Sequence, residues 1–334
     1  MKRINTIILP LLAAAALSSC SKQAAPDSNF PEDRVIRVQA SVLPSTKGSY
    51  TTGVLNEFAF YSVNFNDTGL SYIYSKKCSR SPYSFVGYTA SWEWEDGVPL
   101  WKNSSDEVGM IAIAPLPSEY QYMSYDYFDH NGGNQGYKFQ IQTAQSSSDS
   151  GSDLIGWCKK GQPSAFLNND KKVNIEFQHL LSQLNLSFVL ATEFNALEIP
   201  ESDIVSEVVI KNTSISAFVQ SLEEQGELKL SATAMSSTKA DVSAYTTGWT
   251  SVTSKEDRCR SQWECILVPE AGANITISFN VNGKPYICTL SGKNLEQGKA
   301  HNLTINVGKD VATVGPMTIA GWVESDSHSN LETE

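Results

Sequence analysis

The sequence NITISFNVNGKPYICTL, residues 274–290, contains the clearest secondary-structure pattern in this chain. Its apolar residues stand at alternate positions on either side of Asn282-Gly283: Ile275, Ile277, Phe279, Val281, Tyr286, Cys288 and Leu290. Alternation with a period of two is typical of strands buried on one face. Asn-Gly suits the positive φ angles of a two-residue type I′ turn. The stretch therefore predicts a β-hairpin.

The same alternation recurs elsewhere, and long helical stripes are nearly absent. It is present in VIRVQASV (35–42), HNLTINV (301–307) and MTIAGWV (317–323). Many short strands separated by Gly, Pro, Asn and Ser favour β-sandwiches over a parallel α/β sheet. At roughly 150 residues per domain, the 334 − 19 = 315 residues left after removal of an N-terminal leader at 1–19 predict two domains. With the polar stretch LNNDKK as the boundary, we expect one β-sandwich at 35–170 and another at 171–334.

The alternation changes phase within KVNIEFQHLLSQLNLSFVL, residues 172–190. The apolar residues first occupy odd positions and, from Leu184 onward, even ones. Such a change predicts a bulge or a break near His179–Gln183. A single helical turn containing Leu180, Leu181 and Leu184 is an alternative interpretation.

The N-terminus has the pattern of a secretory leader. Lys2 and Arg3 precede an apolar run from Ile7 to Leu17, which is followed by small residues. The run is shorter than the ~20 apolar residues that a membrane span needs. The sequence Leu17-Ser18-Ser19-Cys20 resembles the lipobox of bacterial lipoproteins. It implies a signal peptide at 1–19, a lipid on the Cys20 thiol that holds the chain on a membrane, and a flexible tether at 20–34.

Charge and motif content exclude several function classes. The net charge of −11 becomes −13 once Lys2 and Arg3 are removed, so phosphate backbones would repel the chain and we expect no nucleic-acid partner. The four histidines stand in no hydrolase or metalloprotease motif, which predicts no enzyme and no cofactor. YDYFDHNGGNQG (125–136) lacks the spacing of a calcium loop, so no metal site is expected. Cys259 and Cys265 could close a small disulfide loop.

Three tryptophans lie close together in SWEWEDGVPLW: Trp92, Trp94 and Trp101. Trp92 and Trp94 would share one face of a strand. If that face is exposed, the rings form a platform for a glycan; if it is buried, they belong to the core. The sequence favours the core.

Several segments, in order along most of the chain, resemble the fimbrillins, the subunits of type V pili in Gram-negative bacteria. They are the lipobox, the early strand, SSSDSGSDLIGW (146–157), VNIEFQHLLSQLNLSF (173–188), GKAHNLTINVGKD (298–310) and MTIAGWVES (317–325). The resemblance implies two tandem transthyretin-like, Greek-key β-sandwich domains. It also implies a cell-surface protein that supports adhesion.

The resemblance further implies assembly by protease-triggered donor-strand exchange. The protease would cut after a basic residue that follows the first strand, here Lys47, leaving Gly48 as the new N-terminus. The displaced strand would carry Ile36, Val38, Ala40 and Val42. The donor strand would carry Met317, Ile319, Gly321 and Val323 and would fill the vacated site of another subunit. Many fimbrillins have Arg at the cut site, so Lys47 puts an Arg-specific protease in question.

Other interpretations stay open at this point. Lys47 also fits a solvated loop lysine, and 317–323 fits the last strand of its own domain. The chain could be a monomeric surface lipoprotein that binds a host glycan or protein, or a pilus anchor that keeps its lipid. We expect it in the outer membrane before processing and in the fimbrium afterwards.

Overall fold

The structure is a computed structural model, and it describes residues 29–43, 54–66, 69–81, 91–128, 136–147, 150–194, 199, 204–250 and 259–322. The described residues form strands and short 3-10 helices, with no α-helix among them. The 3-10 helices are η1 (Tyr120–Tyr122), η2 (Tyr125–Tyr127), η4 (Ser150–Ser152), η5 (Pro163–Ala165) and η6 (Thr192–Phe194). The all-β class predicted from the alternation is confirmed.

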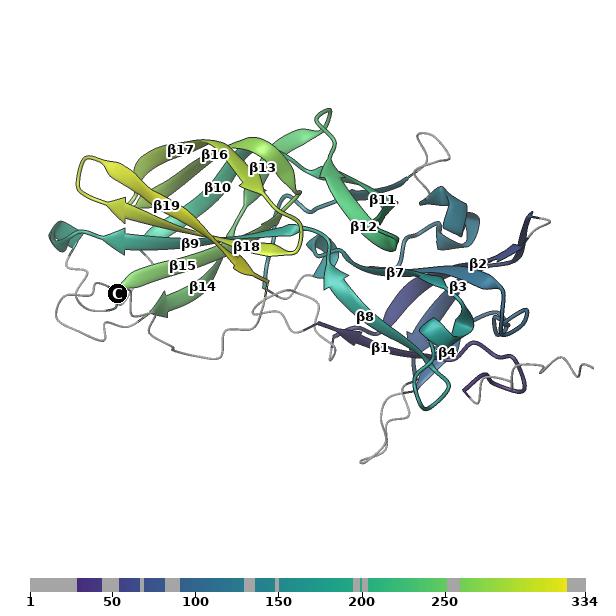
Figure 1. The fold of residues 1–334 in the computed structure, drawn as a ribbon. Helices are drawn as coiled ribbons and strands as arrows, with labels where there is room; N and C mark the ends of the chain where they lie inside the picture. The colour runs from purple at the N-terminus through teal and green to yellow at the C-terminus, as the bar shows by residue number, and fades with distance from the viewer. Residues whose placement is uncertain are drawn as a thin grey trace, which may run out of the picture.

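The N-terminal half is built on a seven-stranded sheet (Figure 1). Its strands, in spatial order, are β1 (Val38–Val42), β8 (Val173–His179), β7 (Ile155–Gly161), β5 (Glu107–Ala114), β2 (Glu57–Asn66), β3 (Gly69–Arg80) and β4 (Trp92–Trp94). Only the β1–β8 pair is parallel. The sheet curls, so that Phe58 of β2 meets Phe177 of β8 with ring centroids 5.3 Å apart although two strands separate them.

A three-stranded sheet lies against the other face of this sheet. Its strands are β12 (Glu227–Ala234), β11 (Ser216–Glu224) and β6 (Tyr137–Gln140). Apolar residues of β11 and β12, among them Val219 and Leu230, share one buried cluster with Tyr61 and Ile111 of the seven-stranded sheet. Strands from the second half of the sequence thus complete the core of the first half.

The C-terminal half is a sandwich of two sheets. One contains β13 (Lys239–Ser243), β10 (Val205–Ser214), β16 (Glu270–Val281) and β17 (Lys284–Leu295). The other contains β14 (Tyr245–Thr250), β15 (Arg260–Leu267), β9 (Ser182–Leu190), β18 (Lys299–Val307) and β19 (Ala312–Gly321). Phe188 of β9 and Phe279 of β16 pack across the interface, with ring centroids 4.7 Å apart.

The β-hairpin predicted for residues 274–290 is confirmed. β16 and β17 pair antiparallel from Val281–Lys284 to Ile275–Leu290, and Asn282 and Gly283 adopt φ angles of 50° and 76°. Every apolar residue named from its alternation is buried. Local turn chemistry and burial therefore suffice to specify this unit.

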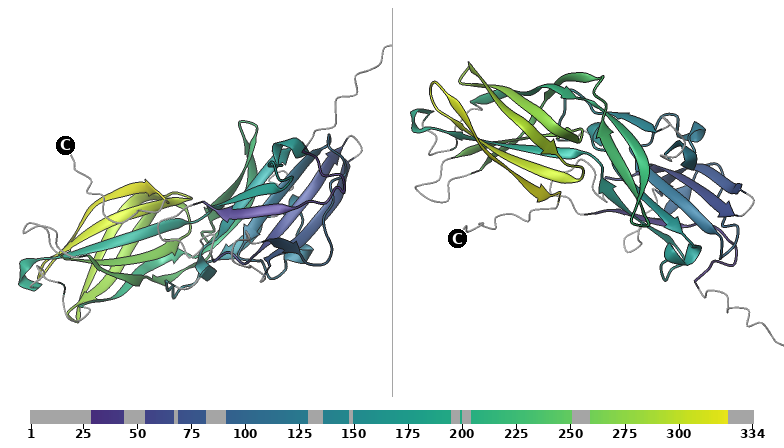
Figure 2. Two further views of the ribbon diagram at one scale, coloured as in Figure 1. Left: turned by 90° about the horizontal axis from the view of Figure 1, so that it is seen from below. Right: turned by 45° about the horizontal axis from the view of Figure 1, so that its top comes forward.

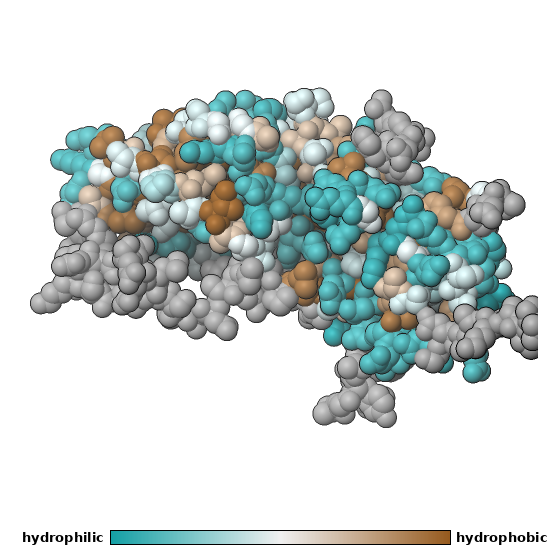
Figure 3. Space-filling model, viewed as in Figure 1, coloured by the Kyte–Doolittle hydropathy of each residue, from teal (hydrophilic) through white to brown (hydrophobic). Residues whose placement is uncertain are grey.

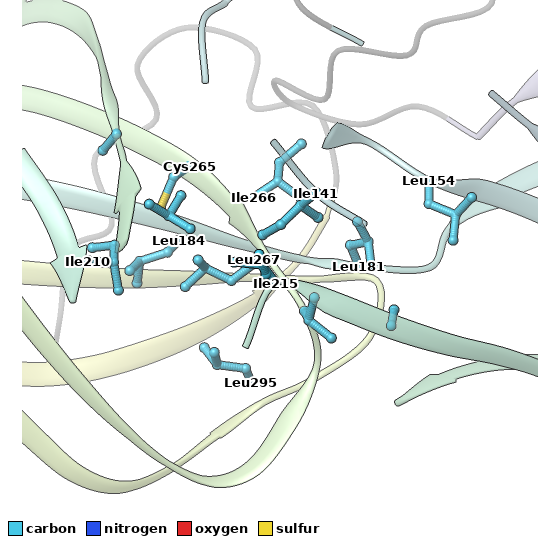
Figure 4. Close-up of a cluster of buried hydrophobic side chains, with 14 of the residues drawn as sticks. Ile141, Leu154, Leu181, Leu184, Ile210, Ile215, Cys265, Ile266, Leu267 and Leu295 are labelled. Carbon is cyan, nitrogen blue, oxygen red and sulfur yellow. The ribbon is translucent and has the colours of Figure 1, made fainter. Parts of the chain in front are cut away.

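The phase change in residues 172–190 is a break between sheets. β8 ends at His179, β9 begins at Ser182, and Leu180 and Leu181 between them lie in the buried core. The Leu180 N–H donates to the Leu154 carbonyl at 2.8 Å, so the chain crosses from one sheet to the other without a helical turn. Figure 4 shows Leu184 beside Ile210 and Cys265 of the C-terminal half and Leu181 on the side of Ile141 and Leu154, all within one buried cluster.

The predicted boundary between residues 170 and 171 stays a prediction. β8 lies on its C-terminal side, yet it pairs with β1 and β7 of the seven-stranded sheet. A single buried cluster also joins residues of both halves.

Candidate functional site

Among the described residues, the early strand lies at the end of the seven-stranded sheet and pairs with β8 alone (Figure 2). The pairing runs from Val38–Val173 to Val42–Phe177 without a register shift. One more backbone bond continues it, from the Leu43 N–H to the Phe177 carbonyl at 2.9 Å. Losing residues 38–42 would therefore expose one edge of β8, and losing the chain before them would also break the backbone bonds to residues 99–101.

The four side chains expected to be displaced are all buried: Ile36, Val38, Ala40 and Val42. They belong to a cluster lined by Phe58, Phe60, Trp101 and Phe177, among others. The residues between them face outward, for Gln39 is exposed and Ser41 is half-exposed. A peripheral strand thus supplies part of an apolar core.

The chain just before β1 is held against the segment that follows β4. Backbone bonds join Ile36 to Pro99 and Arg34 to Trp101, at 2.9 and 2.8 Å. On the surface, Arg37 Nη2 lies 2.6 Å from Asp33 Oδ2. This charge-assisted hydrogen bond lowers the pKa of Asp33 to about 2. The backbone bonds hold the start of β1 in register with the segment after β4, and the ion pair stabilises the local conformation of residues 33–37.

The C-terminal strand β19 lies at the edge of the five-stranded sheet and pairs with β18. Met317 stands opposite Leu303 and Ile319 opposite His301, both of which are buried. Met317 is half-buried, Ile319 is 47% exposed and Gly321 is exposed. The expected burial of this alternation is therefore only partly realised, and within the described residues β19 is the last strand of its sheet.

The three tryptophans face the cluster beneath β1. Trp101 is 1% exposed, and Trp92 and Trp94 pack on Phe58 and Phe60 with ring centroids 5.0 Å apart in each pair. The Trp94 Nε1–H donates to the Ile36 carbonyl at 2.8 Å. A buried Trp101 offers no ring face to a sugar, which corrects the glycan-platform interpretation for that residue.

Several sites named from the sequence lie outside the described residues. They are Cys20, Lys47, Gly48 and Val323, together with residues 129–135 of the stretch considered as a calcium loop. Their roles stay predictions.

The described residues contain no group of three or more His, Cys, Asp or Glu side chains placed to hold a metal ion. The five cysteines after Cys20 are free, so the small loop between Cys259 and Cys265 is not closed by a disulfide. Burial raises the pKa of the half-buried Cys158 to about 12, and a thiol in that state is a weak nucleophile. In the part of the chain that the structure describes, no helix is long and apolar enough to cross a membrane.

The sequence interpretation missed one contact near the end of the chain. Trp322, directly after β19, is buried and stacks on the His179 imidazole with centroids 4.1 Å apart and an interplanar angle of 15°. His179 Nδ1 lies 2.9 Å from Asp153 Oδ1, and both side chains are almost fully buried. The signal in the sequence was Trp322 itself, a large apolar residue between two positions assigned to the inner face.

Comparison with known proteins places this geometry in a family. A family model described as fimbrillin-like matches residues 61–322. The chain belongs to the fimbrillin-like family. No curated protein matches it.

The fold of this fimbrillin-like chain is also found in solved structures. A proposed cell adhesion protein from Bacteroides uniformis is 16% identical, with a TM-score of 0.54, and the match covers 88% of this chain and 100% of that one. A second, from Bacteroides ovatus, is 12% identical with a TM-score of 0.54, over 87% and 99% of the two chains. The C-terminally truncated tip fimbrial protein Mfa3 from Porphyromonas gingivalis is 10% identical with a TM-score of 0.47, over 85% and 99%. Figure 3 shows one face of the chain, on which hydrophobic residues are interspersed among hydrophilic ones.

Proposed function

We propose that this chain is a structural pilus subunit that is exported as a surface lipoprotein through Cys20 and assembled by strand exchange. The observation that carries the proposal is the position of β1. It is a peripheral strand with one partner, and its inner side chains belong to an apolar cluster. Cleavage after Lys47 would separate β1 covalently from the rest of the chain.

Loss of β1 would leave a site that can accept a strand from another subunit. The edge of β8 from Val173 to Phe177 would offer unpaired backbone groups, and the cluster around Phe58 and Phe177 would lose its cover. An incoming strand with small to medium apolar residues at alternate positions satisfies both requirements, because main-chain bonds supply affinity and alternate side chains fill pockets.

The C-terminal segment of another subunit is the strand we expect there. Met317 and Ile319 are apolar residues at alternate positions of an edge strand, and neither is fully buried in its own subunit. Neither of these two side chains therefore gives up a fully buried position when the strand leaves. Gly321 and Val323 would complete the same face.

The role of Cys20 depends on Lys47. If Lys47 is cut, the lipid leaves with β1, the anchor is temporary and the subunit joins the fimbrium. If Lys47 stays intact, the lipid remains on an outer-membrane protein, as a pilus anchor or a monomeric adhesin for a host glycan or protein requires. The burial of Trp101 gives the glycan alternative no support.

Limited trypsin treatment of the purified precursor tests the proposal. We expect a new N-terminus at Gly48 and a ladder of polymers on non-reducing gels. Lys47→Ala should abolish both, whereas Lys309→Ala, a change of another exposed lysine, should alter neither. Equal polymerisation of the Lys47→Ala variant would refute processing at this residue.

A further inference from the structure

The end of β19 is fixed more firmly than the strand itself. Residues 318–321 are all exposed, whereas Trp322 is only 5% exposed. Beyond the ladder with β18, the Trp322 N–H bonds to the Gly298 carbonyl at 3.3 Å, and its ring stacks on His179. An aromatic stack of this kind adds to the free energy gained from burial alone.

His179 is held rigidly where it receives the tryptophan. Its Nδ1 lies 2.9 Å from the Asp153 carboxylate, and its backbone pairs with Ile155 of β7. The Asp153 contact fixes the orientation of the imidazole ring. The stacking partner of Trp322 is therefore part of the seven-stranded sheet, although β19 belongs to the five-stranded one.

His179 also ends β8, the strand that pairs with β1. Strand β8 thus makes both contacts. Its residues 173–177 pair with β1, which we expect to be displaced, and its last residue, His179, stacks on Trp322 at the end of the expected donor strand. A change in the position of β8 at one of these places is transmitted to the other through one continuous strand.

Two polar atoms limit what the stack contributes to stability. His179 Nε2 and Trp322 Nε1 are both buried and find no hydrogen-bond partner among the described residues. A buried polar group without a partner carries a desolvation cost, which offsets part of what the stack contributes.

We propose that Trp322, His179 and Asp153 form a latch that holds β19 in its own subunit while β1 is in place, and that weakening of β1 opens it. In this state β19 is withheld from other subunits. When β1 leaves, β8 loses its outer partner, the His179 ring shifts relative to Trp322, and β19 is released for exchange. The inference rests on the proposed strand exchange for its purpose, but the latch itself is a property of the single precursor chain.

Hydrogen exchange of the intact, uncleaved precursor, followed by mass spectrometry on peptides that cover 312–321, tests the latch. Trp322→Ala should accelerate exchange in β19 by roughly tenfold, the size expected for loss of an aromatic stack. His179→Gln keeps an amide donor for Asp153 but cannot stack, so it should produce the same acceleration. Trp249→Ala, on β14 of the same sheet, is the matched control and should leave β19 unchanged.

The link to β1 is tested by adding Val38→Ala. Val38→Ala should accelerate hydrogen exchange of β19 in the otherwise wild-type chain. In the Trp322→Ala chain it should cause no further acceleration. Gln39→Ala should leave the exchange of β19 unchanged in both chains. Unchanged β19 exchange in both Trp322→Ala and His179→Gln would overturn the latch. Equal, additive effects of Val38→Ala in the two backgrounds would overturn the coupling. Failure of trypsin-dependent polymerisation would instead count against the proposed function, because the exchange measurement needs neither cleavage nor polymers.

Discussion

Replacing the inward-facing residues of β1 with alanine should destabilise the whole N-terminal sheet. Val38 is 5% exposed and Ile36 is 2% exposed, and both contact the cluster that contains Phe58 and Phe177. If β1 were only an outer strand resting on a finished core, shortening these side chains would change little. The structure makes the opposite prediction.

The magnitude follows from the carbon atoms removed. At ~0.8 kcal/mol per buried CH₂, Val38→Ala costs about 1.6 kcal/mol and Ile36→Ala about 2.4 kcal/mol before any cavity is counted. Unrelaxed cavities raise such values toward about 2–5 kcal/mol. Because β1 has a partner on one side only, it can shift inward, so we expect the lower part of that range. The two residues share neighbours, and the double variant should fall near 4 kcal/mol without strict additivity.

Equilibrium urea unfolding measures these differences, with Gln39→Ala as the control on the outward face of the same strand. The control should lie within about 0.5 kcal/mol of wild type, as surface substitutions usually do. A Val38→Ala variant as stable as Gln39→Ala would refute the reasoning. In that case β1 would contribute no core, and its removal would create no apolar acceptor.

Three further predictions concern contacts that stabilise the fold. The Gln145 side-chain amide accepts a hydrogen bond from the Ile266 N–H at 2.7 Å and donates one to the Ile266 carbonyl at 2.8 Å. Gln145→Ala should therefore lower the free energy of unfolding, measured in urea, by about 2–4 kcal/mol. An unchanged free energy would mean that these buried backbone groups find other partners. Burial lowers the pKa of His301 in the folded chain, so below about pH 6.5 the unfolded chain binds more protons than the folded one. The melting temperature should therefore keep the full contribution of His301 above about pH 6.5 and fall as the pH drops below that value. His301→Gln should flatten that part of the profile, and an unchanged slope would contradict it. The pKa of Asp33 is lowered to about 2 by Arg37, so its stabilising contribution is present above about pH 4 and is lost as the pH falls toward 2. Asp33→Asn should remove this acid-range dependence, measured by melting temperature between pH 2 and 5.

Much of the all-β fold could be predicted because its signals are local. The 274–290 hairpin needs only alternation and Asn-Gly, and the strand at 301–307 shows its buried face directly. The phase change after His179 also marked the break between sheets correctly, since a two-residue period cannot change phase within one regular strand. What alternation cannot supply is the identity of the partner strand. The parallel pairing of β1 with β8 joins residues far apart in the chain and has no local signature.

In the candidate site too, the burial of side chains could be predicted from the sequence, whereas their contact partners could not. Burial of Ile36 and Val38 followed from their period, and it was observed. The alternation of 317–323 predicted a uniform inner face, but β19 ends at Gly321 and the buried residue after it is Trp322. Its burial depends on His179 in another sheet, a partner that no pattern within the strand could reveal.

One continuous segment, residues 173–190, connects the two places where strand exchange is proposed. In the seven-stranded sheet it runs as β8 parallel to β1, and in the five-stranded sheet it runs as β9 parallel to β18, which carries β19. The proposed acceptor edge and the proposed donor are therefore linked through one continuous backbone segment, with His179 at the end of β8 where the chain crosses between sheets. Leu180 and Leu181 at this crossing are buried in the core, so we expect a displacement of β8 to be carried to β9. If strand exchange occurs as proposed, a subunit built in this way would make the availability of its donor strand depend on the occupation of its own acceptor, which would favour polymer growth at processed subunits over premature association of precursors.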